Sequence, residues 1–128
     1  MFNYSENKPT TSEKGSKSEQ LAEEYLVREG FQIVCKNYRF GKIGEIDIIA
    51  REKNVLVFVE VKSRFGDNPI APLDQITPAK AQKLKKTAEG YIYTHGLYDQ
   101  ECRFDVIAIE YKKAKPNIEH LRNAIIFF

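Results

Sequence analysis

Two acidic residues and a lysine have a spacing along the sequence that predicts a metal-dependent site. Asp47 lies within the segment GEIDII, residues 44–49, and Glu60 and Lys62 end the segment VLVFVEVK, residues 55–62. Both segments are rich in aliphatic and β-branched residues, which is typical of buried strands. Carboxylates at such positions need a physical reason, because a buried charge is costly unless it is paired.

The register of the hairpin formed by these two strands brings the carboxylates together. If residues 53–54 form a two-residue loop, Asp47 lies opposite Glu60, with their Cβ atoms roughly 5 Å apart. Like charges directly opposite each other destabilise a sheet. A divalent cation would neutralise them, and carboxylate and backbone carbonyl oxygens are the ligands that Mg²⁺ takes. The pattern therefore predicts a metal site at Asp47 and Glu60.

A plainer explanation of the same residues is an ordinary ion pair. The register also places Glu45 opposite Lys62, and charged residues are common where strands leave a core. We favour the metal because Asp47, Glu60 and Lys62 all fall on one face, directly after an apolar run. Glu45 is then expected to have a supporting role rather than to be a ligand.

The remaining elements must hold this hairpin in place. A helix is predicted from Ser16 to Gly30, because Ser16 and Glu19 have the spacing of a capping box. A second helix is predicted from Thr77, with Pro78 at its first position. Strands are predicted at residues 31–40, 44–51, 55–62 and 103–111, with a short fifth strand from residue 118 and a loop at 63–76. The order αβββαβ with mixed strand pairing predicts an α/β fold, in which helices flank a central mixed sheet.

Length and composition indicate one domain. The chain has 128 residues, of which 1–14 are polar and are expected to form a flexible tail before a single domain at 15–128. The net charge of +2 is too small to indicate a nucleic-acid partner by itself. The apolar run at 55–59 is too short to span a membrane and no targeting segment is visible, so we expect a cytoplasmic protein without membrane association. Cys35 and Cys102 lack metal-binding spacing and are predicted to be free thiols.

These segments resemble a known group of proteins. GEID (44–47) followed by FVEVK (58–62) resembles the D…(D/E)-x-K signature of the PD-(D/E)xK nuclease superfamily. More narrowly, the chain from about residue 14 to 126 resembles the YraN-like family of small uncharacterised bacterial proteins. That resemblance is carried by the G-x-x-x-E of residues 15–19, NYR at 37–39, GEIDII, FVEVKSR, TPAK at 77–80 and RFD at 103–105. One departure is Ser18, where that family usually has a glycine.

The resemblance implies a restriction-endonuclease-like core and assigns roles to individual residues. Asp47 and Glu60 would bind Mg²⁺ or Mn²⁺ together with the main-chain carbonyl of Val61. Lys62 would orient or deprotonate the attacking water and stabilise charge on the phosphate. Glu19 would be a further ligand from the first helix, as in Holliday-junction-resolvase-like members. For Glu19, a role as a helix cap explains the sequence equally well, and both alternatives stay open.

Basic residues near this site predict contacts with a nucleic-acid backbone. Lys80 and Lys83 fall on the polar side of the second helix, and Arg39 and Arg64 lie around the same strands. A lysine run on a helix is usually only a solvated face. Beside a candidate phosphodiesterase site, however, these four residues predict a rim that contacts phosphates. A homodimer, which would present two sites to two strands, is a further expectation.

Three functions compete on this basis. The first is a metal-dependent nuclease that hydrolyses phosphodiester bonds in DNA, including branched or structured DNA. The second is a nucleic-acid-binding protein of nuclease-like fold with little or no catalysis. The third is a scaffold without a nucleic-acid role. We favour the nuclease, because a pure binding protein has no need of a costly cluster at Asp47, Glu60 and Lys62.

Overall fold

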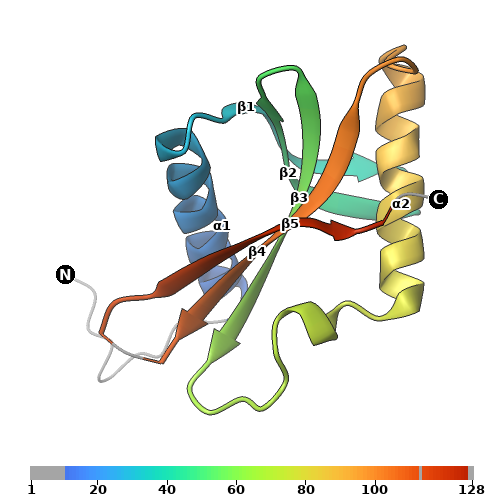
Figure 1. Cartoon of the computed structure of the whole chain (residues 1–128). Coiled ribbons are helices and arrows are strands. Elements are labelled where there is room, and N and C mark those ends of the chain that lie inside the picture. The colour runs from blue at the N-terminus through green and yellow to red at the C-terminus, as the bar shows by residue number, and fades with distance from the viewer. Residues whose placement is uncertain (1–10, 113, 127–128) are drawn as a thin grey trace.

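The structure contains a central sheet with one helix against each face. The computed structural model describes residues 11–112 and 114–126 (Figure 1). The elements are, in chain order, α1 (Thr11–Arg28), β1 (Gln32–Phe40), β2 (Gly44–Glu52), β3 (Val55–Phe65), the short 3-10 helix η1 (Leu73–Gln75), α2 (Pro78–Thr94), β4 (Cys102–Tyr111) and β5 (Asn117–Ile125). The predicted order is confirmed, and the short fifth strand forms a full edge strand of nine residues.

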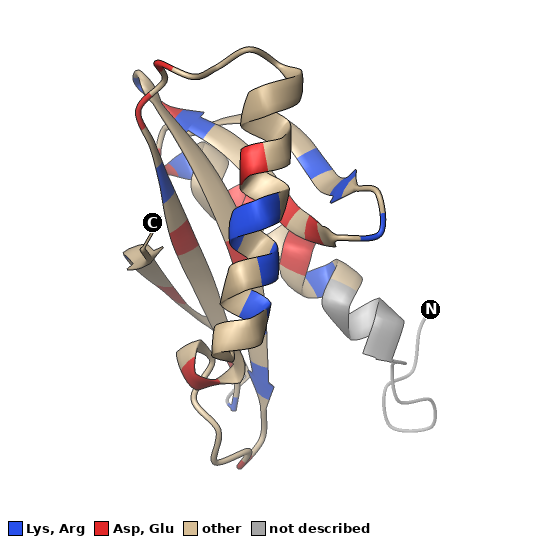
Figure 2. Cartoon of the chain, turned by 90° about the vertical axis from the view of Figure 1, so that its right-hand side faces the viewer, with Lys and Arg blue, Asp and Glu red and all other residues tan. Residues whose placement is uncertain are grey.

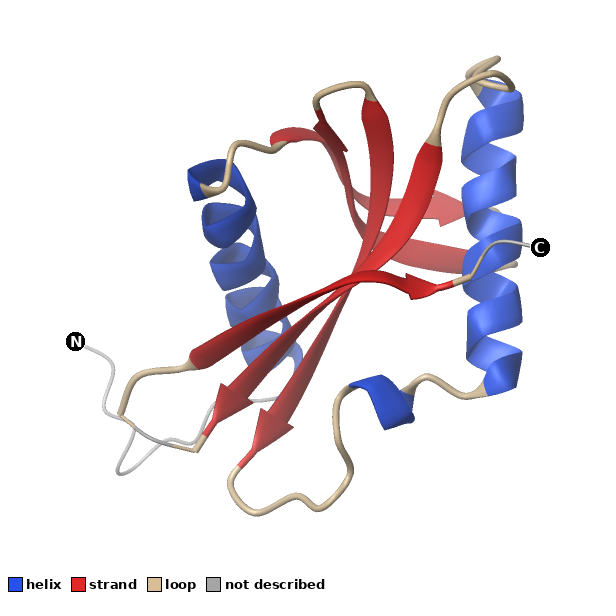
Figure 3. Ribbon diagram, viewed as in Figure 1, coloured by secondary structure: helices blue, strands red, loops and turns tan. Residues whose placement is uncertain are grey.

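The sheet is mixed. Its strands have the spatial order β1-β2-β3-β4-β5. β3 and β4 are parallel and are connected through α2, whereas the other neighbours are antiparallel. The strands twist strongly across the sheet (Figure 3). This α/β arrangement agrees with the predicted restriction-endonuclease-like core.

Each helix covers its own hydrophobic cluster. On one face, Ala22 and Leu26 of α1 pack with Val57 and Val59 of β3. On the other face, Leu84, Ala88 and Tyr91 of α2 pack with Phe58 of β3 and Phe104 of β4. β3 is therefore covered on both sides, which explains why its first five residues form an almost purely apolar run.

Helix α1 differs from its prediction at the N-terminus. It begins at Thr11, so Ser16 lies inside the helix and the capping box of Ser16 and Glu19 is not formed at its start. Of the predicted tail, residues 11–14 are helical and residues 1–10 lie outside the described part of the chain. The helix ends at Arg28, and the predicted C-terminal glycine, Gly30, follows it with a φ of +94° and donates its backbone N–H to the carbonyl of Val27.

Helix α2 packs unusually closely against the start of β2. Its N-cap is Thr77, whose hydroxyl accepts from the backbone N–H of Lys80, as predicted. A Cβ atom built on Gly44 would lie 2.6 Å from Thr87 Oγ1. Such a distance is too short for a side chain, so the glycine allows the helix to approach the strand. The first turns of α2 consequently lie beside the ends of the predicted catalytic strands.

Two further expectations concern the thiols and the membrane. Cys35 and Cys102 are free and half-buried, and both pack against the cluster under α2. In the ranges that the structure describes, neither helix is long and apolar enough to cross a membrane.

Candidate functional site

The hairpin register is the one that the two-residue loop predicts. β2 and β3 pair from Glu52–Val55 to Ile48–Val59, and the regular pairing ends there. At the next level the Oδ2 atom of Asp47 accepts a hydrogen bond of 2.8 Å from the backbone N–H of Val61. The strands therefore separate at Asp47, and its carboxylate takes the place of a strand carbonyl.

Glu60 lies in this gap with one oxygen atom that has no partner. Its side chain is only 13% exposed, and its Oε2 atom lies 3.4 Å from Nζ of Lys62. Within the described part of the chain, Oε1 of Glu60 is the one buried side-chain nitrogen or oxygen without a hydrogen-bond partner. An orphaned buried oxygen is costly, and in a native protein it usually marks a missing ligand or a functional group.

The two carboxylates strongly disfavour ionising together. Burial, and secondly the charge of Asp47, raise the pKa of Glu60 to about 8. Burial also raises the pKa of Asp47, although the hydrogen bond from Val61 partly opposes it. A divalent cation would stabilise both ionised carboxylates at once, and Oε1 of Glu60 is available to it. Asp47, Glu60 and a backbone oxygen such as that of Val61 therefore fit a hard metal ion.

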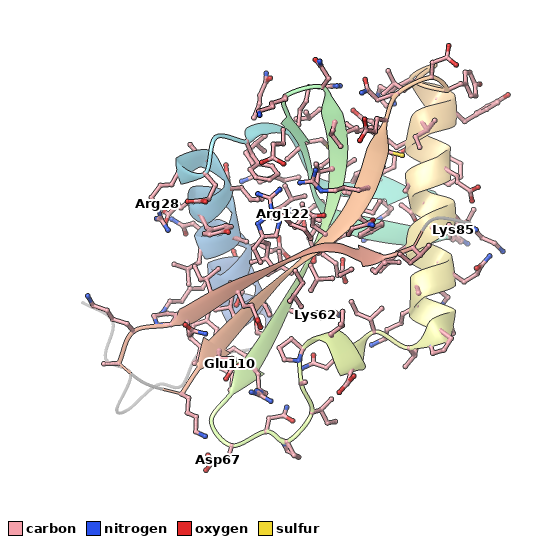
Figure 4. The ribbon with its side chains drawn as sticks, viewed as in Figure 1. Arg28, Lys62, Asp67, Lys85, Glu110 and Arg122 are labelled. Carbon is pink, nitrogen blue, oxygen red and sulfur yellow. The ribbon has the colours of Figure 1, made fainter. Side chains whose placement is uncertain are left out.

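Lys62 belongs to the site rather than to the predicted alternative ion pair. The Lys62 side chain is 20% exposed, and its ammonium group pairs with Glu60. Glu45 pairs instead with Arg39, at 2.9 Å. Figure 4 shows Lys62 on β3, on the side of the sheet that faces α2. The ordinary pair of Glu45 with Lys62 is thus replaced by two separate pairs, one at the site and one at its rim.

Glu19 approaches the site from α1 without completing a carboxylate triad. It is half-buried, and its pKa is raised by burial and then by the charge of Asp47, while a hydrogen bond with the side chain of Asn37 lowers it. Among the described residues, no three His, Cys, Asp or Glu side chains converge closely enough to hold a metal by themselves. The role of Glu19 as a ligand stays a prediction, and its alternative role in a capping box is not supported.

A cleft opens between the ends of β2 and β3 and the first turns of α2. Its volume is about 210 Å³, and it is lined by Gly44, Glu45, Glu60, Lys62, Ile76, Lys80, Lys83 and Leu84. The predicted contact residues Lys80 and Lys83 thus share a cleft with Glu60 and Lys62. Figure 2 shows several basic residues along α2, and two of them, Lys80 and Lys83, line this cleft. A polyanion that enters it would meet lysines on one wall and the carboxylates on the other.

The two predicted arginines have different surroundings. Arg64 is half-buried and pairs across β3 and β4 with Glu110, at 3.0 Å. Arg39 is 71% exposed but is paired with Glu45. The structure therefore brings the two lysines into the cleft and holds both arginines in ion pairs.

Ser18 has a role that the sequence did not reveal. It is 1% exposed, and its hydroxyl accepts a 2.6 Å hydrogen bond from the hydroxyl of Ser63 on β3. It also lies 2.8 Å from the hydroxyl of Tyr111 on β4. The serine that stands in place of the expected glycine therefore ties α1 to the strands that carry the site.

A second polar cluster surrounds His120, for which no partner was evident from the sequence. Asp105 is fully buried and is bonded to Nε2 of His120 at 2.8 Å, to Arg103 at 2.9 Å and to the backbone N–H of Asn123 at 2.9 Å. The hydroxyl of Tyr25 lies 3.1 Å from Nδ1 of the same histidine. The alternation of Arg103 and Asp105 on an otherwise apolar strand is the sequence signal that could have indicated such a network.

Sequence comparison shows which known proteins this chain is similar to. A sequence model of the uncharacterised protein family UPF0102 matches residues 18–109, a range that includes the candidate metal-site residues Glu19, Asp47, Glu60 and Lys62. A UPF0102 protein of Dichelobacter nodosus is 36% identical over 124 residues, which cover 97% of this chain and 98% of that protein. Another, of Nitrosococcus oceani, is 42% identical over 123 residues, covering 91% and 95%. A third, of Natranaerobius thermophilus, is 42% identical over 113 residues, covering 87% and 95%.

Proposed function

This chain belongs to the uncharacterised protein family UPF0102, and we propose that it is a metal-dependent nuclease that hydrolyses phosphodiester bonds in DNA. The observation that carries the proposal is the buried Oε1 atom of Glu60, which has no partner and lies beside Asp47 in a cleft lined with lysines. The resemblance of the chain to the PD-(D/E)xK nucleases assigns the metal to the same residues, Asp47 and Glu60. Such an arrangement is costly to a protein that does not bind a cation.

The residues of the chain divide the chemical work between them. Asp47, Glu60 and the carbonyl of Val61 would hold Mg²⁺ or Mn²⁺, with Glu19 as an additional ligand. When bound, the ion supplies a water of lowered pKa and neutralises charge on the phosphate. Lys62, whose ammonium lies 3.4 Å from Glu60, can donate a hydrogen bond to a phosphate oxygen or hold the attacking water. Because Lys62 lies so close to Glu60, a proposed metal ligand, its ammonium group would stay beside the phosphate that the metal binds.

Lys80 and Lys83 would contact the DNA backbone. They line the same cleft as Glu60, and Nζ of Lys80 lies 3.5 Å from the carbonyl of Gln75, which directs it along the cleft wall. Arg39 and Arg64 would add outer contacts, weakened by their existing ion pairs. Branched or structured DNA, a cytoplasmic location and a homodimer with two sites are parts of the same proposal.

A second candidate is a DNA-binding protein with little catalysis. The arrangement of the carboxylates favours this candidate, since no three acidic side chains in the described ranges converge on one metal position. The lysines of the cleft would serve such a protein equally well.

One titration separates the two candidates. Linear, branched and single-stranded DNAs are incubated with the protein and increasing Mg²⁺ or Mn²⁺, and both binding and cleavage are measured. The nuclease proposal expects cleavage that needs the metal and is lost in Glu60→Gln. Binding to DNA without cleavage at any metal concentration would support the second candidate instead.

A further inference from the structure

Strands β1 and β2 both break their side-chain alternation at the same level. In a regular strand, residues three apart face opposite sides of the sheet. In β1, however, Cys35 and Tyr38 both pack against the cluster under α2. Their partners in β2, Ile49 and Ile46, pack against that same cluster. The register between the strands is unchanged across this level, so the side chains of both strands change face at the same point.

Asn37 and Asp47 lie at the centre of this double break. The pairs Lys36–Ile48 and Tyr38–Ile46 flank them, so Asn37 lies opposite Asp47. Asn37 has a φ of +53°, a left-handed conformation that is unusual inside a strand and that asparagine tolerates better than most residues. A β-branched or bulky residue would be strained there.

The consequence of the break is the position of the Asp47 carboxylate. It does not lie over either face of the sheet, because its Oδ2 atom accepts from the backbone N–H of Val61, which points along the plane of the sheet. The carboxylate therefore lies in the gap between β2 and β3, beside Glu60. A β2 that alternated regularly would direct the same side chain over one of the two helices.

We propose that Asn37 is a positioning residue for the candidate metal centre, whose left-handed backbone lets β1 follow the kink of β2 and so holds the Asp47 carboxylate between β2 and β3. This inference rests on the proposed metal-dependent function. The side chain of Asn37 adds a second link, because its interaction with Glu19, the acidic residue that approaches from α1, lowers the pKa of that carboxyl. Asn37 does not itself touch the metal position in this scheme.

The alternative is that Asn37 only relieves backbone strain, as any residue in a bulge does. The chain offers a matched control for this. Asn123 in β5 has a φ of +51° and donates its backbone N–H to Asp105, in the other polar cluster. Replacing either asparagine with alanine introduces the same left-handed strain, but only Asn37 is linked to Asp47.

The test is calorimetric titration of the full chain with Mn²⁺, together with thermal melts, for the wild type and for Asn37→Ala, Asn37→Gly and Asn123→Ala. Asn37→Ala should weaken Mn²⁺ binding by roughly tenfold or more, the scale on which residues that support metal ligands act. Asn37→Gly should stay within about threefold of the wild type, because glycine adopts a positive φ without strain. Asn123→Ala should lower the melting temperature and leave Mn²⁺ affinity unchanged.

Each other outcome has a definite meaning. If the wild type binds Mn²⁺ and Asn37→Ala binds it equally well, the inference is wrong while the metal centre stands. If Asn123→Ala weakens Mn²⁺ binding as much as Asn37→Ala, the loss reflects general destabilisation and the inference is wrong. If Asn37→Gly and Asn37→Ala lose Mn²⁺ affinity equally, the left-handed backbone of residue 37 is not the cause and the inference is wrong. If the wild type itself binds no Mn²⁺, the proposed metal centre fails and the inference fails with it.

Discussion

At the scale of single residues, Glu60 is where packing and chemistry are in conflict. It interrupts an apolar strand, is almost completely buried, and has one oxygen without a partner. Lys62 is the nearest compensating charge, at 3.4 Å. One ammonium group cannot balance the carboxylates of both Glu60 and Asp47, so in the metal-free site Glu60 stays largely protonated at neutral pH.

The stability of the metal-free protein should therefore fall as the pH rises. The pKa of Glu60 is raised from 4.5 to about 8 in the folded state, so the folded protein binds the proton more tightly than the unfolded chain does. The stabilisation is complete below pH 4.5 and is lost as the pH rises towards 8, on the order of a few kcal/mol. Chemical denaturation with a chelator, over a series of pH values, measures this.

Two variants make this pH experiment specific. Glu60→Gln should abolish most of the dependence and be more stable than the wild type at pH 8, because no buried charge forms. Glu45→Gln removes a carboxylate that is paired with Arg39 at the rim and should keep the wild-type profile. If stability depends on pH in the same way in Glu60→Gln and in the wild type, the pH dependence does not arise from Glu60.

Lys62 should matter for cleavage much more than for folding. Lys62→Ala is expected to reduce cleavage by a factor of about a hundred or more, the scale of one positioned proton-transfer or charge-stabilising group. The melting temperature should change little. The matched control is Lys112→Ala, because the Lys112 side chain is 64% exposed and lies 3.9 Å from Asp67. Full activity of Lys62→Ala in a paired melt and cleavage assay would exclude the proposed role.

At the scale of elements, the cleft exists because α2 approaches β2 at Gly44. The helix carries Lys80 and Lys83, and the strand carries Glu45 and Asp47, so their separation sets the width of the cleft. Thr87 occupies the space that a side chain on residue 44 would need, and its hydroxyl donates to the carbonyl of Lys83. The hydroxyl that fills this space is therefore held in place by a hydrogen bond within α2.

A methyl group at this contact should push the helix away. Gly44→Ala would place a Cβ atom 2.6 Å from Thr87 Oγ1, and we expect a loss of about 1–3 kcal/mol in the free energy of unfolding. In the double variant Gly44→Ala/Thr87→Ala the clashing hydroxyl is gone, so part of the loss should be recovered. Denaturation of both single variants and the double variant gives the interaction energy between the two positions. If the two single losses in the free energy of unfolding simply add, the contact between residue 44 and Thr87 is not their cause.

At the scale of the whole molecule, the distribution of charge matters more than the net charge. The formal net charge is only +2, yet basic residues gather along α2 (Figure 2), and two of them, Lys80 and Lys83, line the cleft. Elsewhere, arginines are neutralised in pairs, as Arg103 and Arg122 are by Glu52. A polyanion would accordingly be attracted to the cleft rather than to the molecule as a whole.

DNA binding should therefore weaken with salt in a manner that depends on the cleft. In the double variant Lys80→Ala/Lys83→Ala, affinity should fall and the salt slope should decrease by about two, because each phosphate contact contributes about one. The control double variant Lys112→Ala/Lys115→Ala makes the same change of charge around a different pocket and should keep the wild-type slope. The same result for both double variants would indicate that binding is not localised at the cleft.

Local chemistry by itself determined the central hairpin and the order of the elements. Turn length and strand alternation act between neighbours in sequence, so a loop at residues 53–54 was enough to bring Asp47 and Glu60 to one level of the sheet. The cap of α2 at Thr77 is equally local, since its hydroxyl reaches only three residues along the chain.

The partner that each charged or polar group takes was decided only by the tertiary structure. Glu45 pairs with Arg39 rather than Lys62 because the strands separate at Asp47, which alternation does not anticipate. His120 finds Asp105 only because β4 and β5 lie side by side. The unpartnered oxygen of Glu60 is also a tertiary property, because a strand residue is buried only when a helix and neighbouring strands cover it. The sequence therefore determined that Asp47 and Glu60 lie at one level of the hairpin, and packing decided which side-chain atoms water can no longer reach.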